Sequence, residues 1–230
     1  MLNLVDSLEG LVKKLTLPGN KSSWSHYYDE ASQRPDYLAH KQKIIELWLD
    51  KIKPVSTAAD LGANKGEFSK IVAANNIQTI AADFDGYCIN TLYKQIKKTG
   101  EKNILPLIID LSKPSPAIGV NNEERKSFLH RTKVDLVLAL ALVHHLAIGK
   151  NIPLDKIAAL FAQLCRYLII EFVPKLDEKI QLMLSGKNDI YAGYSEENFI
   201  AAFSNYFIIE EKEIIASSGR IVYLMKKNEG

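Results

Sequence analysis

The sequence has few cysteines, no long hydrophobic run and no large excess of either charge. Its two cysteines, Cys88 and Cys165, and its five histidines match no zinc-ligand spacing. We therefore expect no bound metal and two reduced thiols, as in a cytoplasmic protein. No segment approaches the roughly 18–20 apolar residues of a membrane helix, so no membrane association is expected. The net charge is +2, which gives no strongly basic footprint for nucleic acid.

The first fifty residues are predicted to be helical. Leucines recur at helical spacing from Leu4 to Leu15, and a second helix from about Pro35 carries an apolar stripe through Ile45, Trp48, Leu49 and Ile52. The lysines at positions 41, 43, 51 and 53 are assigned to its solvated face. Between the two helices lies an aromatic cluster in a predicted loop, which includes Trp24, Tyr27 and Tyr28.

From Val55 onward, short apolar runs alternate with amphipathic helices. Strands are predicted at residues 55–59, 79–82, 104–109, 134–140 and 167–173, and the third should lie at a sheet edge because it contains Pro106. Helices are predicted at residues 123–130, after Asp155 as a cap, and after Ser195. Two last strands, 207–215 and 220–225, are joined by only four residues and must form an antiparallel hairpin. The pattern predicts an α/β fold with a mostly parallel sheet, whose ligands bind beyond the carboxyl ends of the strands.

The segment after the first strand predicts a nucleoside site. It contains a glycine turn, Asp60-Leu61-Gly62-Ala63-Asn64-Lys65-Gly66, that leads into a helix and is expected to expose unpaired backbone N–H groups. Asp83 ends the second strand about 20 residues after Gly62, the spacing at which an acidic residue bonds ribose hydroxyls. Asp110 ends the third strand, where a carboxylate can accept from an adenine amino group. Each aspartate alone could be a turn former or a helix cap, but three in register favour a nucleoside.

These features resemble the class I S-adenosylmethionine (SAM)-dependent methyltransferases over about residues 55–226. The resemblance implies a Rossmann-like, doubly wound sheet of seven strands in the order 3-2-1-4-5-7-6, with the last strand antiparallel. The SAM-binding domain would span residues 54–230, after an N-terminal helical extension or lid at residues 1–53. The cofactor-binding residues it implies are Asp60, Gly62, Ala63, Asn64 and Gly66 in the turn, Asp83 and Phe84, Asp110 and Leu111, and Leu140. A narrower resemblance, at residues 24–28, 124–127, 138–146 and 171–174, is to a bacterial nodulation-protein-like subgroup of these enzymes.

Two competing nucleotide folds fit less well. A nicotinamide-dependent dehydrogenase carries G-x-G-x-x-G, whereas this chain has Gly62 and Gly66 separated by three other residues. A Walker A loop is absent from the sequence. Asp60, placed before the turn, suits a cofactor with an ammonium group better than a pyrophosphate.

Candidate catalytic residues follow the fourth and fifth strands. His144 and His145 lie about 100° apart on a helix, so one of them is expected to face the cofactor and act as a base. Glu171 could be a base, orient a histidine or bind substrate. All three have structural alternatives, such as a hydrogen bond that orders the loop. Trp24, Tyr27 and Tyr28 could close over the cleft and contact the sulfonium, or could instead pack between the first helices.

The absence of certain motifs from the sequence argues against some classes of methyl acceptor. It has no Asp/Asn-Pro-Pro-Tyr/Phe motif for amino methylation of nucleic-acid bases, and the fourth strand does not end in the aspartate expected of an RNA ribose methyltransferase. We therefore expect a methyltransferase for a small molecule or sugar-like metabolite. A methyltransferase for RNA or protein and a non-catalytic SAM-binding module are the alternatives.

Overall fold

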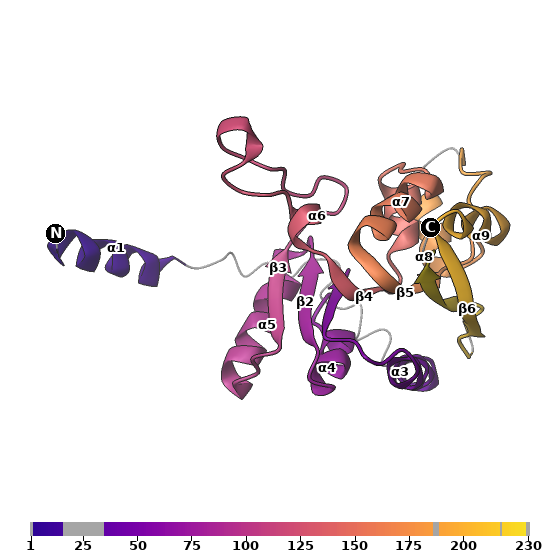
Figure 1. The fold of residues 1–230 in the computed structure, drawn as a ribbon, viewed down its shortest axis with the longest axis horizontal. Helices are drawn as coiled ribbons and strands as arrows, with labels where there is room; N and C mark the ends of the chain where they lie inside the picture. Colours follow the sequence, from indigo (N-terminus) through magenta and orange to yellow (C-terminus); the bar gives the residue numbers. More distant parts are fainter. Residues whose placement is uncertain (1, 16–34, 186–188, 217, 229–230) are drawn as a thin grey trace.

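A single mixed sheet organises the chain. The computed structural model describes residues 2–15, 35–185, 189–216 and 218–228. The sheet has the order β3-β2-β1-β4-β5-β7-β6, with β7 antiparallel to both of its neighbours (Figure 1). The strands are β1 Thr57–Leu61, β2 Gln78–Asp83, β3 Ile104–Ile108, β4 Val134–Ala139, β5 Cys165–Phe172, β6 Phe207–Ile214 and β7 Ile221–Lys227. The predicted α/β fold, strand order and reversed strand are confirmed.

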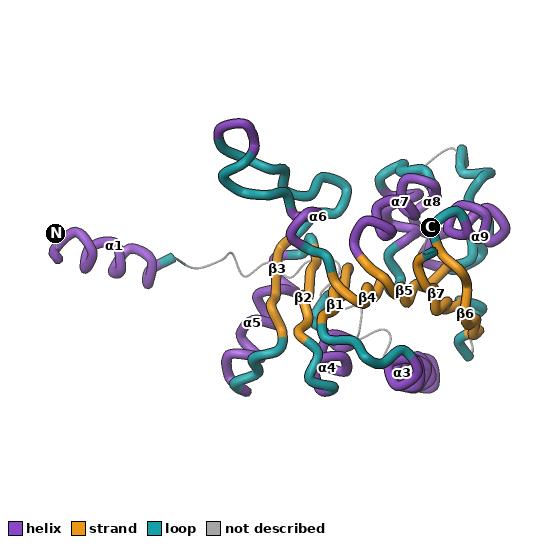
Figure 2. The backbone as a smooth tube through the Cα atoms, in the orientation of Figure 1, coloured by secondary structure: helices purple, strands orange, loops and turns teal. Residues whose placement is uncertain are grey.

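Helices cover both faces of this sheet, as Figures 1 and 2 show. The helices of the described residues are α1 Leu2–Lys14, α3 Pro35–Lys51, α4 Glu67–Ala74, α5 Gly86–Thr99, α6 Phe128–Arg131, α7 Leu154–Leu164, α8 Glu178–Leu184 and α9 Glu196–Ser204, with a 3-10 turn at Val120–Asn122 and a π-helical turn, η2, at His145–Gly149. Helices α3, α4 and α5 lie on one face, and α7 and α9 lie on the other. Among the described residues, none of these helices has the length and hydropathy needed to cross a membrane.

The alternation of side chains along β4 explains why the sheet is covered on both sides. Leu136 and Leu138 pack in the hydrophobic cluster that contains α3 and α4 residues. Val137 and Ala139, one position along, pack in the cluster that contains α7 and α9 residues. Successive side chains of a strand point to opposite faces, so a strand this apolar requires a helical layer on each side.

The edge strand, the start of α9 and the final hairpin lie where the sequence predicted them. β3 lies at the sheet edge, as Pro106 predicted. The Ser195 side chain caps α9 by accepting from the Asn198 N–H, and Gly100 ends α5 in a left-handed conformation with φ 74°. The predicted hairpin pairs β6 with β7.

Two predicted helix starts were wrong. The helix expected at residues 123–130 is only Phe128–Arg131, because an antiparallel bridge joins Ile118 to Arg125 and folds the preceding residues into a turn. Asp155 lies inside the first turn of α7, and Pro153 occupies the cap position instead. Proline at a helix start has no N–H to leave unpaired, which is why it can take this place.

The N-terminal region contains two helices in different environments. The leucines of α1, including Leu4, Leu8 and Leu11, are exposed. By contrast, Ile45 and Leu49 of α3 are buried in the same cluster as β4. Residues 16–34 lie outside the described residues, so the division of the chain at residue 53 and the lid stay predictions.

Candidate active site

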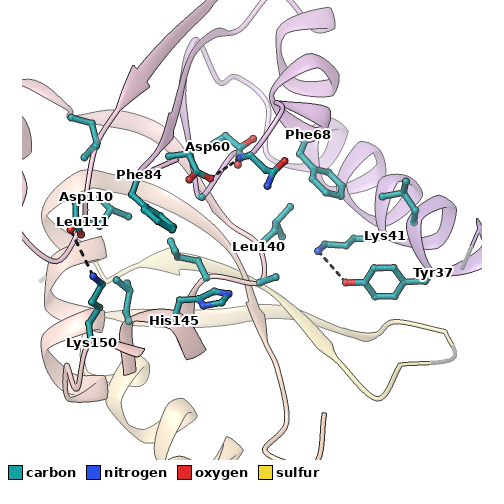
Figure 3. A pocket seen from close by; sticks show the side chains of 18 residues that line it. Tyr37, Lys41, Asp60, Phe68, Phe84, Asp110, Leu111, Leu140, His145 and Lys150 are labelled. Atoms are coloured by element: carbon teal, nitrogen blue, oxygen red, sulfur yellow. Dashed lines mark hydrogen bonds and ion pairs between the residues drawn. The ribbon is translucent and has the colours of Figure 1, made fainter. Parts of the chain in front are cut away.

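A pocket lies at the carboxyl ends of β1, β2 and β4 (Figure 3). The predicted site residues that line it are Asp60, Gly62, Asn64, Asp83, Phe84, Asp110, Leu111, Leu140 and His145. Further lining residues are Tyr37, Leu38, Lys41, Phe68, Ile109, Ala141, Leu142, Leu146 and Lys150. The pocket thus combines residues from strand ends that are far apart in the chain, from Asp60 at β1 to Leu140 at β4. Four predicted site residues, Ala63, Gly66, His144 and Glu171, lie outside its lining.

The glycine turn adopts three left-handed conformations in close succession. Gly62, Asn64 and Gly66 have φ values of 83°, 50° and 78°. Asparagine tolerates this region better than most residues, so Asn64 takes a conformation that is otherwise typical of glycine. A Cβ on Gly66 would lie 2.7 Å from Leu92 Cδ1, which shows how closely the turn approaches α5. Gly66 therefore shapes the turn from behind the pocket.

The backbone donors of this turn are not unpaired, in contrast to the expectation from the sequence. The N–H groups of Gly62 and Ala63 both donate to the Ala82 carbonyl, at 2.8 and 3.0 Å. The Asn64 N–H donates to Asp83 Oδ2 at 2.8 Å, and the Gly66 N–H donates to the Ala63 carbonyl at 2.8 Å. Three of these N–H groups pair with the end of β2 and the Gly66 N–H pairs within the turn, so a ligand has four fewer backbone donors to bind.

Asp83 joins the turn to the second strand and faces the pocket. Its Oδ1 accepts from the Asp85 N–H at 2.9 Å, and its Oδ2 accepts from Asn64. The two oxygens of a carboxylate offer about four lone pairs, so the group keeps capacity to accept from a ligand hydroxyl. Burial raises the pKa of Asp83, although these backbone hydrogen bonds oppose the effect. The geometry suits a ribose, whose two hydroxyls are donors.

The far end of the pocket contains Phe84, Asp110 and Lys150 (Figure 3). The Phe84 side chain is 58% exposed although it is large and apolar, as expected of a ring that a flat ligand would cover. Asp110 Oδ1 accepts from the backbone N–H and the hydroxyl of Ser112, at 2.9 and 2.6 Å. Although burial raises it, the pKa of Asp110 is held below its usual value by these bonds and by the charge of Lys150. Asp110 is thus both a turn former and a pocket residue.

Asp60 is a buried carboxyl at the base of the pocket. It is 2% exposed, and its Oδ2 accepts from the Ser69 hydroxyl at 2.6 Å. Burial raises the pKa of Asp60 to about 6, despite that hydrogen bond. A cationic ligand group placed beside it would favour the charged carboxylate.

The two histidines differ in what they face. His145 lines the pocket from the start of η2, and burial together with the nearby Arg220 charge lowers its pKa to about 4. His144 is 2% exposed, and its Nδ1 has no hydrogen-bond partner among the described residues. Burial and the adjacent His145 hold the pKa of His144 well below its usual value. Because both pKa values are lowered, both rings are neutral near pH 7. The two rings are in contact, with their centroids 4.1 Å apart.

Glu171 belongs to a buried network beside the pocket. Lys41 donates to Glu171 Oε2, and Tyr37 donates to Oε1 at 3.1 Å. Arg220 Nη1 lies 3.5 Å from the same oxygen, and its Nε donates to Asp177 at 2.8 Å. Burial would raise the pKa of Glu171, but Lys41 and Arg220 hold it below its usual value. Glu171 is therefore a fixed anion that contacts two cations.

Lys41 and Tyr37 were missed by the sequence analysis. Lys41 was assigned to a solvated helix face, yet it is 3% exposed and lines the pocket. A signal was available, because Tyr37, Lys41, Ile44 and Trp48 recur at helical spacing on one stripe. A lysine on such a stripe is buried only when its charge is paired, and its partner Glu171 is far away in the sequence. Trp24, Tyr27 and Tyr28 lie outside the described residues, and their role stays a prediction.

The strand order and the helices on both faces are those of the Rossmann-like fold of class I SAM-dependent methyltransferases. The chain resembles the N-methyltransferase NodS from Bradyrhizobium japonicum WM9, crystallised with S-adenosyl-L-homocysteine, with a TM-score of 0.62, 12% identity, and coverage of 84% of this chain and 88% of that one. It also resembles the 16S rRNA methylase RmtB, with a TM-score of 0.56, 14% identity, and coverage of 97% and 80%. At these identities the likeness establishes the fold. No protein-family model matches the chain.

The sequence has a curated relative as well. The chain is 36% identical over 212 residues to the nodulation protein NoeA of Rhizobium meliloti (strain 1021), which it matches over 92% of its own length. It spans 44% of that protein. This chain is thus a homologue of one part of NoeA.

Proposed function

We propose that the protein transfers a methyl group from SAM to a small molecule or sugar-like metabolite. The observation that supports this most directly is the pocket itself. Figure 3 places Asp110 and Lys150 at one end, Lys41 at the other and Asp60 between them, and Asp83 also lines the pocket. These groups suit the adenine, ribose and amino-acid tail of one extended cofactor.

The residues present fit each part of that cofactor. Phe84 and Leu111 supply apolar surface for the adenine, and Asp83 supplies acceptor lone pairs for the ribose hydroxyls. Asp60 supplies a carboxylate for the ammonium group of the tail. Leu140, Ala141 and Leu142 at the tip of β4 would line the reacting centre. When bound, SAM supplies an electrophilic methyl group on a positively charged sulfur.

The chain's contribution to the reaction is mainly positioning. Holding two reactants in line can lower a barrier by roughly 7–11 kcal/mol. His145 presents a neutral imidazole in the pocket and can accept a hydrogen bond from the acceptor's N–H or O–H group. With a pKa of about 4, it orients an acceptor more effectively than it removes a proton.

The helix beside the pocket and the low net charge favour a small acceptor. Tyr37 and Leu38 of α3 line the pocket beside Lys41, so a helix borders the end near β4. The net charge of +2 gives little attraction for a polyanion such as RNA. The acceptor is therefore expected to enter as a small molecule beside α3.

The test is methyl transfer from labelled SAM into separated cell fractions: metabolites, RNA and protein. The expected result is label in the metabolite fraction, lost with the Asp83→Ala variant. Label only in RNA or protein would contradict the small-molecule acceptor. Tight SAM binding with no label in any fraction would contradict the enzymatic function itself.

A further inference from the structure

The Lys41 ammonium group is buried at the end of the pocket. Lys41 is 3% exposed, lines the pocket from α3, and lies over the ring of Phe68, with 5.1 Å from Nζ to the ring centroid. A buried ammonium is costly unless it is paired, and Lys41 is paired with Glu171. It also donates to the Tyr37 hydroxyl at 3.5 Å. An ammonium group has three protons, so a third donor position remains for a ligand.

The glycine turn offers few donors of its own at this end. The N–H groups of Gly62, Ala63, Asn64 and Gly66 are all engaged by acceptors within the chain. A carboxylate that entered beside the turn would therefore need a different donor. Among the described lining residues, the lysines are Lys41 and Lys150, and Lys150 lies at the opposite end near Asp110.

Lys41 and Asp60 together make this part of the pocket complementary to a zwitterion. Both are buried and line the same pocket, and the Lys41 charge favours the charged form of Asp60. A carboxylate and an ammonium that line one pocket match the ammonium and carboxylate of a free α-amino acid. Glu171 and Tyr37 hold the Lys41 side chain, which reduces the conformational entropy lost when a ligand binds.

We infer that Lys41 is the counter-ion for the α-carboxylate of the bound cofactor, with Asp60 as the partner of its ammonium group. This inference rests on the proposed use of SAM. It makes α3 part of the cofactor site, so that the N-terminal region contributes a binding residue from outside the glycine turn. Glu171 then acts through Lys41 as a positioning residue.

The inference is tested by comparing ligands that differ only in the tail. S-adenosylhomocysteine has the carboxylate and the ammonium, its decarboxylated analogue keeps only the ammonium, and methylthioadenosine lacks both. Calorimetry should show that Lys41→Met weakens S-adenosylhomocysteine binding at least tenfold. Methylthioadenosine binding should change less than threefold, and Lys41→Arg should restore part of the loss. The matched control is Lys150→Met, at the adenine end, which should change all ligands by the same factor.

The outcomes separate this inference from the proposed function. If Lys41→Met weakened S-adenosylhomocysteine and methylthioadenosine equally, or left both unchanged, the carboxylate contact would be rejected while the cofactor site stood. If the wild-type protein bound none of the adenosyl ligands, the proposed function itself would be rejected. If Lys41→Met did not fold, the wild-type protein alone would decide. An affinity for the decarboxylated analogue within threefold of that for S-adenosylhomocysteine would overturn the inference, and a tenfold loss would support it.

Discussion

Two neighbouring histidines at the tip of β4 have unequal exposure to the pocket. His145 lines it, whereas His144 is buried behind it with Nδ1 unpartnered among the described residues. The sequence predicted that one of them would face the cofactor, and His145 is the one that lines the pocket. The sequence could not show which, because the π-helical turn at His145–Gly149 changes the direction of the side chains relative to a regular helix.

Replacing the histidines one at a time should separate their roles. We expect His145→Ala to lower kcat at least tenfold more than His144→Ala, because only His145 can contact an acceptor in the pocket. Steady-state kinetics with the acceptor found in the labelling experiment would measure this. Equal and small effects on kcat would remove both histidines from the reaction.

His144 should also make the stability depend on pH. Its folded-state pKa is well below 6.5, so the unfolded chain binds a proton that the folded chain does not as the pH falls through about 6.5. The contribution of His144 to the free energy of unfolding should therefore fall as the pH is lowered from 7 to 5. This histidine can contribute a slope of up to about 1.4 kcal/mol per pH unit.

The check is urea unfolding of the wild-type protein and a His144→Gln variant across that range. The variant should show a shallower decrease, and replacing the exposed His130 by Gln should leave the slope unchanged. A slope that was identical in all three proteins would contradict the low pKa of His144.

The helices and strands were predictable where local rules and tertiary packing agree. Pro106 marked an edge strand, Ser195 marked a helix start, and four residues between the last strands required a hairpin. The failures occurred where a long-range contact decided the outcome. The bridge between Ile118 and Arg125 replaced a helix that its charged composition favoured. The burial of Lys41 depends on Glu171, which is 130 residues away in the chain.

The approach of the glycine turn to α5 gives a prediction for these elements. Gly66→Ala would place a Cβ 2.7 Å from the buried Leu92 side chain, at a position with φ 78°. We expect a loss of about 2–4 kcal/mol from strain together with overpacking. Gly100 is the matched control, since its φ is 74° but nothing lies within 4 Å of an added Cβ.

Denaturant unfolding of both variants would measure the difference. Gly100→Ala should cost about 1–2 kcal/mol, the conformational part alone. Equal losses at the two positions would show that α5 does not constrain the turn.

In the molecule as a whole, the residues proposed to bind the cofactor come mainly from neighbouring strand ends, whereas those proposed for the acceptor do not. The strand tips bring Asp60, Asp83 and Asp110 to one edge, as the sequence predicted from three strand ends in register. The residues proposed to lie near the acceptor come from α3, η2 and the end of β4, which the sequence does not place together. The chain also spans only 44% of NoeA.

In the proposed complex, an adenosyl ligand lies across the strand tips with its ribose bound to Asp83. The most direct measurement is calorimetric titration of S-adenosylhomocysteine into the wild-type protein and the Asp83→Ala variant, with circular dichroism to confirm that both are folded. Asp189→Ala, an exposed aspartate outside the pocket, is the control. We expect Asp83→Ala, and not the control, to bind S-adenosylhomocysteine at least tenfold more weakly than the wild-type protein. Equal affinities in all three folded proteins would contradict this expectation.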